Sequence, residues 1–309
     1  MLGGTGRALA AAGALSLVGL SAFPPLVLVP ARRRLGAIGA GLVDETCRRM
    51  HRPLLVAASA ALVGTAAVLV DTASGSGPLV EVSAGTRTGI LLLLRICAVV
   101  LTAVVLTVGT GGRKPAGGRL VAGLAGSVVI LLTFSLSSHA AAVVVDRPVA
   151  VLLDLARLSA AGVWTGGLLA LALAGLPAAR SVAGKDLEVM GDSAAALFSR
   201  YSLIAQVAII IVLLTGGYGA LIQITAVADL GQTWWGIALT AKLALWVSVL
   251  LFAAANAFSF VPALADRAAA RAPSGGGGPT AIRRPRRTGA GRGPDRDRGA
   301  DVRDRTAHP

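Results

Sequence analysis

The chain has 309 residues, of which 55% are hydrophobic and 14% are charged, and its mean hydropathy is +0.75. Because soluble domains average about 25% charged residues, this composition excludes one large soluble core and predicts a polytopic protein whose partner is the lipid bilayer. Much of the net charge of +14 lies after Asp266. In a membrane protein such charge marks the cytoplasmic side, so no nucleic-acid partner is predicted.

Seven segments contain the roughly 20 mainly apolar residues that a membrane-spanning helix needs. In chain order they are 8–30, 54–71, 89–109, 119–136, 148–174, 198–222 and 236–260. The first runs through Pro24 and Pro25, which should kink it, into the basic run ARRR. This stop-transfer pattern favours a retained helix over a cleaved signal peptide. The sequence therefore predicts an all-α transmembrane bundle of about seven helices.

The connections between these segments alternate in their content of Lys and Arg. Stretch 31–53 holds six, 72–88 one, 110–118 two, 137–147 one, 175–197 two and 223–235 none. By the positive-inside rule, the N-terminus is expected outside and the C-terminus in the cytoplasm. The chain is thus predicted to be a multi-pass protein of the cytoplasmic membrane.

Four ionisable residues stand out inside the predicted spans, where a charge costs roughly 2.5–3.5 kcal/mol on insertion scales. Asp154 and Arg157 are three residues apart and can pair on one helical face. Trp164 follows on about the same stripe, before a Gly-Gly pair that would let another helix approach. This polar face should point into the bundle, either as a packing ion pair or as part of a permeation path. Lys242 and Arg95 lie near helix starts and are expected to snorkel outward.

Candidate metal ligands are sparse. His139 ends the fourth span beside two serines, on the predicted outer side, as either a ligand or a polar anchor of the helix end. The run CRRMH places Cys47, Met50 and His51 within five residues, on one face if helical. Copper(I) prefers such sulfur and imidazole ligands, but the neighbouring arginines repel cations. No nucleotide-binding or hydrolase motif occurs, so no enzymatic activity is predicted.

Three stretches carry a family resemblance. They are SSHAAA followed by DLARLSAAGVWTGGLLALALAGLP, then LFSRYSLIAQVAIIIVLLTGGYGALIQI, then LGQTWWGIALTAKLALWVSVLLFAAANAFSFVPAL. In their order and spacing, over about residues 130–265, they resemble the copper resistance protein D family of membrane proteins. The resemblance implies copper handling at the cytoplasmic membrane, as uptake or transfer from outside, with His139 at the family's histidine. Arg157 stands where the family usually has a second histidine, and an arginine cannot bind a metal cation.

The resemblance also suggests how the chain is organised. Residues 1–118 are expected to hold three N-terminal helices, 119–265 the family-like transmembrane domain and 266–309 a disordered basic cytoplasmic tail. The leading hypothesis is transport or transfer of copper ions, with a periplasmic or extracellular copper-binding protein as partner. The alternative is a non-transporting scaffold that serves the oxidase assembly machinery, because the domain often precedes a cytochrome oxidase assembly domain in the family.

Overall fold

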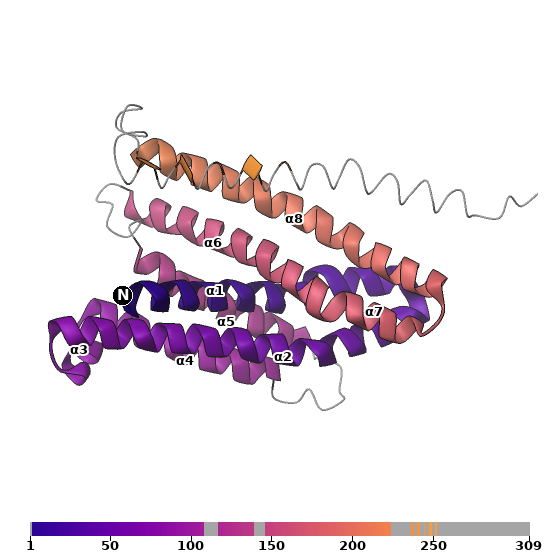
Figure 1. Ribbon diagram of the computed structural model, residues 1–309, viewed down its shortest axis with the longest axis horizontal. Coiled ribbons are helices and arrows are strands. Elements are labelled where there is room, and N and C mark those ends of the chain that lie inside the picture. The colour runs from indigo at the N-terminus through magenta and orange to yellow at the C-terminus, as the bar shows by residue number, and fades with distance from the viewer. Residues whose placement is uncertain are drawn as a thin grey trace, which may run out of the picture. The chain divides into compact units, whose positions relative to one another are not determined.

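The computed structural model describes residues 2–107, 117–138 and 146–223, together with separate positions between 236 and 251. The elements of the described chain are all helical and include no strand, which confirms the predicted all-α fold (Figure 1). The helices are α1 (Leu2–Phe23), α2 (Val29–Ser76), α3 (Leu79–Gly85), α4 (Arg87–Thr107), α5 (Gly117–Leu136), α6 (Arg147–Ala170), α7 (Leu176–Ala183) and α8 (Leu187–Gln223). Two π-helical turns, Pro24–Leu28 and Leu171–Gly175, join α1 to α2 and α6 to α7.

Six of the predicted spans coincide with these helices, whereas the seventh, 236–260, lies largely outside the described residues. By length and apolarity, five helical stretches of the described chain can cross a membrane. The first of them, Gly3–Gly75, includes two predicted spans. The described helices belong to the compact unit Met1–Val227.

The connection 31–53 is itself helical apart from a turn at Gly36. Gly36 has a φ of 57° and a ψ of −124°, a conformation that costs glycine little because it has no Cβ. The chain reverses there, so α1 and the later part of α2 pack side by side. Glycines allow this close approach: a Cβ on Gly13 would lie 2.4 Å from the Ala61 nitrogen, and one on Gly64 2.3 Å from the Ala10 nitrogen.

The predicted connection 175–197 is also almost entirely helical, with only 184–186 between α7 and α8. Residues 37–76 extend about 60 Å at 1.5 Å per residue, twice the roughly 30 Å hydrocarbon core of a bilayer. Apart from Lys185, which lies in the turn between α7 and α8, the basic residues of both connections therefore lie on helices that continue beyond the membrane-spanning length. A sequence reading assigned them to loops because charge interrupts the apolar pattern, although it does not interrupt the helix.

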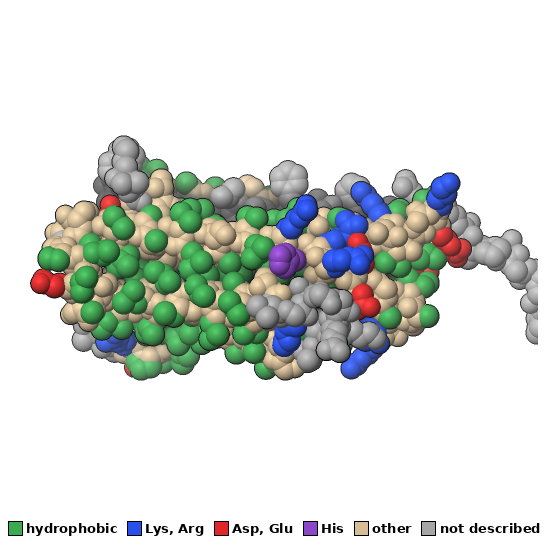
Figure 2. All heavy atoms as spheres, turned by 90° about the horizontal axis from the view of Figure 1, so that it is seen from below, with side chains coloured by type: hydrophobic (Ala, Val, Ile, Leu, Met, Phe, Trp, Pro, Cys, Tyr) green, Lys and Arg blue, Asp and Glu red, His purple; other side chains and the backbone are tan. Residues whose placement is uncertain are grey.

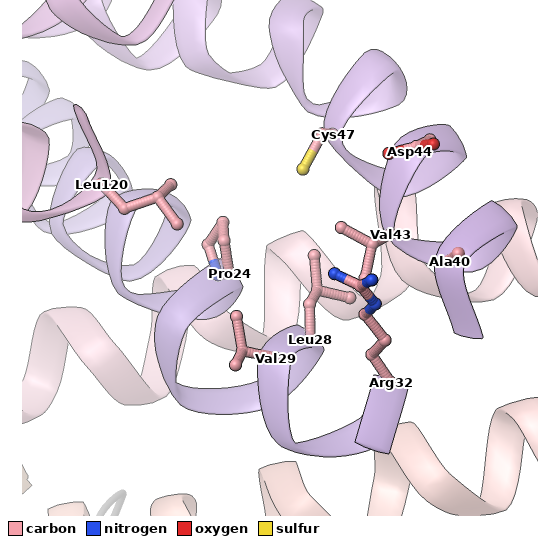
Figure 3. Close-up of a pocket in the computed structure, with 9 residues that line it drawn as sticks. All are labelled: Pro24, Leu28, Val29, Arg32, Ala40, Val43, Asp44, Cys47 and Leu120. Carbon is pink, nitrogen blue, oxygen red and sulfur yellow. The ribbon is translucent and has the colours of Figure 1, made fainter. Parts of the chain in front are cut away.

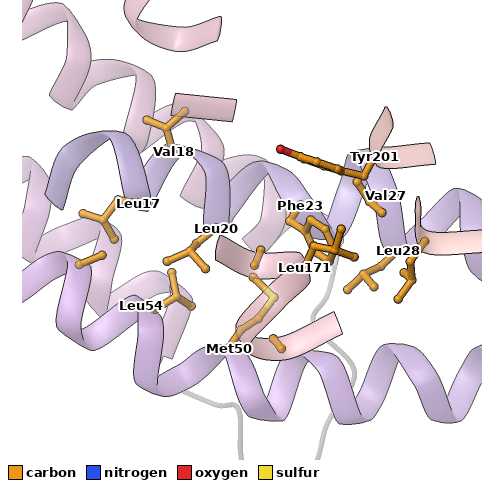
Figure 4. Packing of buried hydrophobic residues seen from close by; sticks show 14 of the residues in the cluster. Leu17, Val18, Leu20, Phe23, Val27, Leu28, Met50, Leu54, Leu171 and Tyr201 are labelled. Atoms are coloured by element: carbon orange, nitrogen blue, oxygen red, sulfur yellow. The ribbon is translucent and has the colours of Figure 1, made fainter. Parts of the chain in front are cut away.

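Bulky apolar side chains from α1, α2 and the second π-helical turn lie in a core that also includes Val99 of α4, Ile130 of α5 and Leu197 of α8. Figure 4 shows Leu20 and Phe23 of α1 packed near Met50 of α2 and Leu171. All four side chains are at most 2% exposed. The core therefore holds together the first helical hairpin and the end of α6.

The connections separate into two groups along the bundle. The N-terminus and α3 lie at one end, and α7 lies at the other (Figure 1). Six basic residues are carried by 31–53, near the α7 end, whereas 72–88, near the α3 end, has one. This separation agrees with the alternation in the sequence and makes the α7 end the expected cytoplasmic end.

Thiol labelling of intact cells can check this orientation. In a chain whose two cysteines are replaced by serine, we expect a membrane-impermeant reagent to modify Ala84→Cys, at the α3 end, and to spare Lys185→Cys, at the α7 end. Both positions are exposed. Labelling of Lys185→Cys with protection of Ala84→Cys would reverse the orientation.

Candidate functional site

The predicted pair on α6 is formed. The Arg157 Nη2 donates to Asp154 Oδ1 at 2.5 Å. The Asp154 side chain is 8% exposed, but the Arg157 side chain is 48% exposed. The polar face of α6 therefore points inward at Asp154 and outward at Arg157, which corrects the expectation that the whole face lies inside the bundle.

The other oxygen of Asp154 is bound by the end of α5. Ser135 Oγ donates to Asp154 Oδ2 at 3.0 Å, and Ser138 Oγ donates to the same oxygen at 3.1 Å. Three donors thus satisfy this buried carboxylate. Hydrogen bonds and an opposite charge stabilise the ionised form, which would otherwise be costly to bury.

Arg95 of α4 does not snorkel outward as expected. It is 4% exposed and lies more than two turns inside α4. Its Nε donates to Thr133 Oγ1 at 2.9 Å, and its Nη2 donates to the Thr133 carbonyl at 3.0 Å and to Ser137 Oγ at 2.9 Å. The guanidinium carbon also lies 3.5 Å from the centre of the Phe134 ring. Residues in the last turn of α5 and directly after it therefore hold this cation in the bundle, through hydrogen bonds and a cation–π contact.

One short segment, the last turn of α5 and the two residues that follow it, hydrogen-bonds both charged side chains. We call Thr133, Ser135, Ser137 and Ser138 the α5 hydroxyl cluster. Thr133 and Ser137 are four residues apart and bind Arg95, whereas Ser135 and Ser138 are three apart and bind Asp154. Spacings of three and four put side chains on common faces of a helical turn, so two faces of this segment bind two opposite charges, Arg95 on one and Asp154 on the other. The signal in the sequence is the density of hydroxyls around 133–138, which by itself does not indicate Arg95 as a partner.

The Gly-Gly pair of α6 makes the predicted close contacts. A Cβ on Gly166 would lie 2.8 Å from the Cα of Gly19 in α1, and one on Gly167 would lie 2.8 Å from the ring of Tyr201 in α8. The Tyr201 hydroxyl donates to the carbonyl oxygen of Trp164 at 2.5 Å. Trp164 is half-buried. This part of α6 therefore positions α1 and α8.

The CRRMH run is helical, as its candidate ligands required, but it places them in different surroundings. Met50 is 2% exposed and packs in the core. Cys47 borders a small cavity of about 80 Å³ together with Asp44 and Arg32 (Figure 3). His51 lines a separate groove between α1 and α2.

Two candidate residues, His139 and Lys242, lie outside the described residues. His139 directly follows Ser138 in sequence and so succeeds the α5 hydroxyl cluster. Within the part of the chain that the structure describes, no three His, Cys, Asp or Glu side chains come together as a metal site. The described residues therefore bring together the Asp154 carboxylate and the hydroxyls of the α5 hydroxyl cluster, with Arg157 and Arg95 bound to them.

Residues 195–288 match the family model of copper resistance protein D. This match confirms the resemblance over the second and third stretches that carry it, and it extends past residue 265, where the tail was expected to begin. The first stretch, which holds His139, Asp154 and Arg157, lies outside the matched residues. No curated protein and no solved structure matches the chain.

A conservative replacement can measure how much the fold depends on Arg95. We expect Arg95→Lys to lower the thermal unfolding midpoint in detergent, because an ammonium cannot reproduce the planar stacking and the two-nitrogen donation of a guanidinium. Hydrogen bonds to charged groups contribute about 1.5–3 kcal/mol each. The matched control is Arg147→Lys, at the exposed start of α6. Equal midpoints for both variants would show that the buried contacts of Arg95 do not stabilise the bundle.

Proposed function

We propose that this protein handles copper in the cell membrane, moving the ion across the bilayer or handing it over at the outer face. The observation that carries the proposal is the match of residues 195–288 to the copper resistance protein D family in a chain with several membrane-length helices. The matched part begins in α8, which packs on α6 through Tyr201.

The end of α5 is the place where we expect an incoming ion to be received. His139 follows the α5 hydroxyl cluster in sequence, and imidazole is a good copper ligand. In the proposed orientation this end of α5 faces outside, where copper would arrive. The hydroxyls and the Asp154 carboxylate supply oxygen atoms for an ion that is losing its water.

The charges around Asp154 limit the site to weak or transient binding. Arg157 neutralises one oxygen of Asp154, and Arg95 adds a second positive charge on the other side of the α5 hydroxyl cluster. Guanidinium groups bind no metal and repel cations. Transient capture suits a transfer step, because an ion that binds too tightly does not move on.

A second function is favoured by a specific observation. The described residues contain no cluster of three ionisable metal ligands, and Met50 of the CRRMH run is occupied in core packing. A scaffold that supports copper delivery to an oxidase, without passing the ion through its own bundle, needs no such cluster. The partner of such a scaffold would be the oxidase assembly machinery. For the transfer function, in contrast, the partner would be a copper-binding protein outside the membrane.

Cellular copper content distinguishes the two functions. In cells that produce equal amounts of each variant, we expect His139→Ala to reduce copper accumulation towards the level of cells without the protein, because the receiving imidazole is lost. The control is His308→Ala, which removes a histidine from the C-terminal tail. Copper is measured by elemental analysis of washed cells.

Equal copper contents for wild type and His139→Ala would contradict the transport proposal. If gene deletion then lowered oxidase activity without changing the copper content, the scaffold function would be supported instead.

A further inference from the structure

A groove between α1, α2 and the end of α6 is not used by the proposed function. Its volume is about 1010 Å³, at the upper limit of the range typical of ligand sites. Arg48, Arg49, His51 and Arg52 line one end of it, and small or aliphatic side chains line the rest. Figure 2 shows basic side chains gathered beside a histidine, next to a broad surface of hydrophobic and small residues. The groove is therefore amphipathic along its length.

The basic end carries an excess of positive charge. Glu45 pairs with Arg48 and accepts a hydrogen bond from Arg49 Nε at 2.6 Å. Within the described part of the chain, no carboxylate forms an ion pair with Arg52. Three arginines against one glutamate leave this end suited to an anionic group, and guanidinium groups match phosphate geometry well.

The apolar part runs away from these arginines into the span of α2. Val56 is 69% exposed, and Leu169 and Leu173 opposite are 41% and 54% exposed. From Arg48 to Ala60 the helix rises about 18 Å. One leaflet of the hydrocarbon core is about 15 Å thick, so the groove matches the depth of a single leaflet.

The arginines also stand at the level expected of a lipid headgroup. They directly precede 54–71, the apolar stretch of α2 that was predicted to span the membrane and that the structure forms as helix. Basic pockets between transmembrane helices recognise anionic headgroups. A soluble anion would use the basic end alone and would leave the apolar walls uncovered.

We infer that this groove binds an anionic phospholipid, with its phosphate at Arg48, Arg49 and Arg52 and an acyl chain lying against Val56, Ala60 and Leu173. The lipid would cover apolar side chains that the protein leaves exposed between α1 and α6. It would also hold α2 at a fixed depth in the bilayer.

Native mass spectrometry of the full chain, released from detergent after incubation with phosphatidylglycerol or phosphatidylcholine, tests the inference. We expect the wild type to retain phosphatidylglycerol preferentially. Arg48→Gln combined with Arg52→Gln should weaken that binding about thirtyfold, because each basic group near an anionic surface contributes about a fivefold gain in affinity. Ala60→Phe, which fills the apolar part without changing charge, should weaken it as well.

The matched control is Arg33→Gln combined with Arg180→Gln, which removes two exposed arginines that do not line the groove. It should retain phosphatidylglycerol as the wild type does. Equal retention of the two lipids, or equal losses in the groove and control variants, would overturn the inference. So would a dimer that dissociates when the groove is altered while lipid binding is unchanged, because the groove would then be occupied by a second copy.

Discussion

Two opposite charges are buried on either side of one helix end, and the bundle depends on the hydroxyls that satisfy them. Arg95 of α4 and Asp154 of α6 would each be costly in lipid, roughly 2.5–3.5 kcal/mol on insertion scales. The α5 hydroxyl cluster hydrogen-bonds both side chains. Because hydrogen bonds to charged groups contribute about 1.5–3 kcal/mol each, the contacts offset the cost of burial and fix α5 between α4 and α6.

Helix α6, which carries Asp154, also contacts the part of the chain that matches a known family. Gly166 packs against Gly19 of α1, and Gly167 makes room for Tyr201 of α8, whose hydroxyl binds the Trp164 carbonyl. The family-matched segment begins in α8. A change in the packing of α8 would therefore be passed to α6, the helix that carries Asp154. This contact links the family-matched segment to the end of α5, where we propose that copper is received.

Much of the fold could be predicted from the sequence, because apolar runs of membrane length determine where helices form. The Asp154–Arg157 pair followed from a spacing of three, and the close approach at Gly166 from the absence of a side chain. The burial of Arg95 could not be predicted, since it depends on hydroxyls that another helix supplies. The helical form of the whole connection 31–53 could not be predicted, because a helix that continues beyond the bilayer has the composition of a loop. The spacing of Cys47, Met50 and His51 puts them on one helical face, but it does not show what surrounds each side chain. Met50 is enclosed in the core, whereas Cys47 and His51 border separate cavities.

The central claim, that the end of α5 receives copper beside His139, is tested most directly by metal analysis of the purified protein in detergent. After incubation with copper and removal of the unbound ion, the account predicts that the wild type retains copper and that His139→Ala loses most of it, with His51→Ala unaffected. Equal retention by the wild type and His139→Ala, or loss only in His51→Ala, would contradict it.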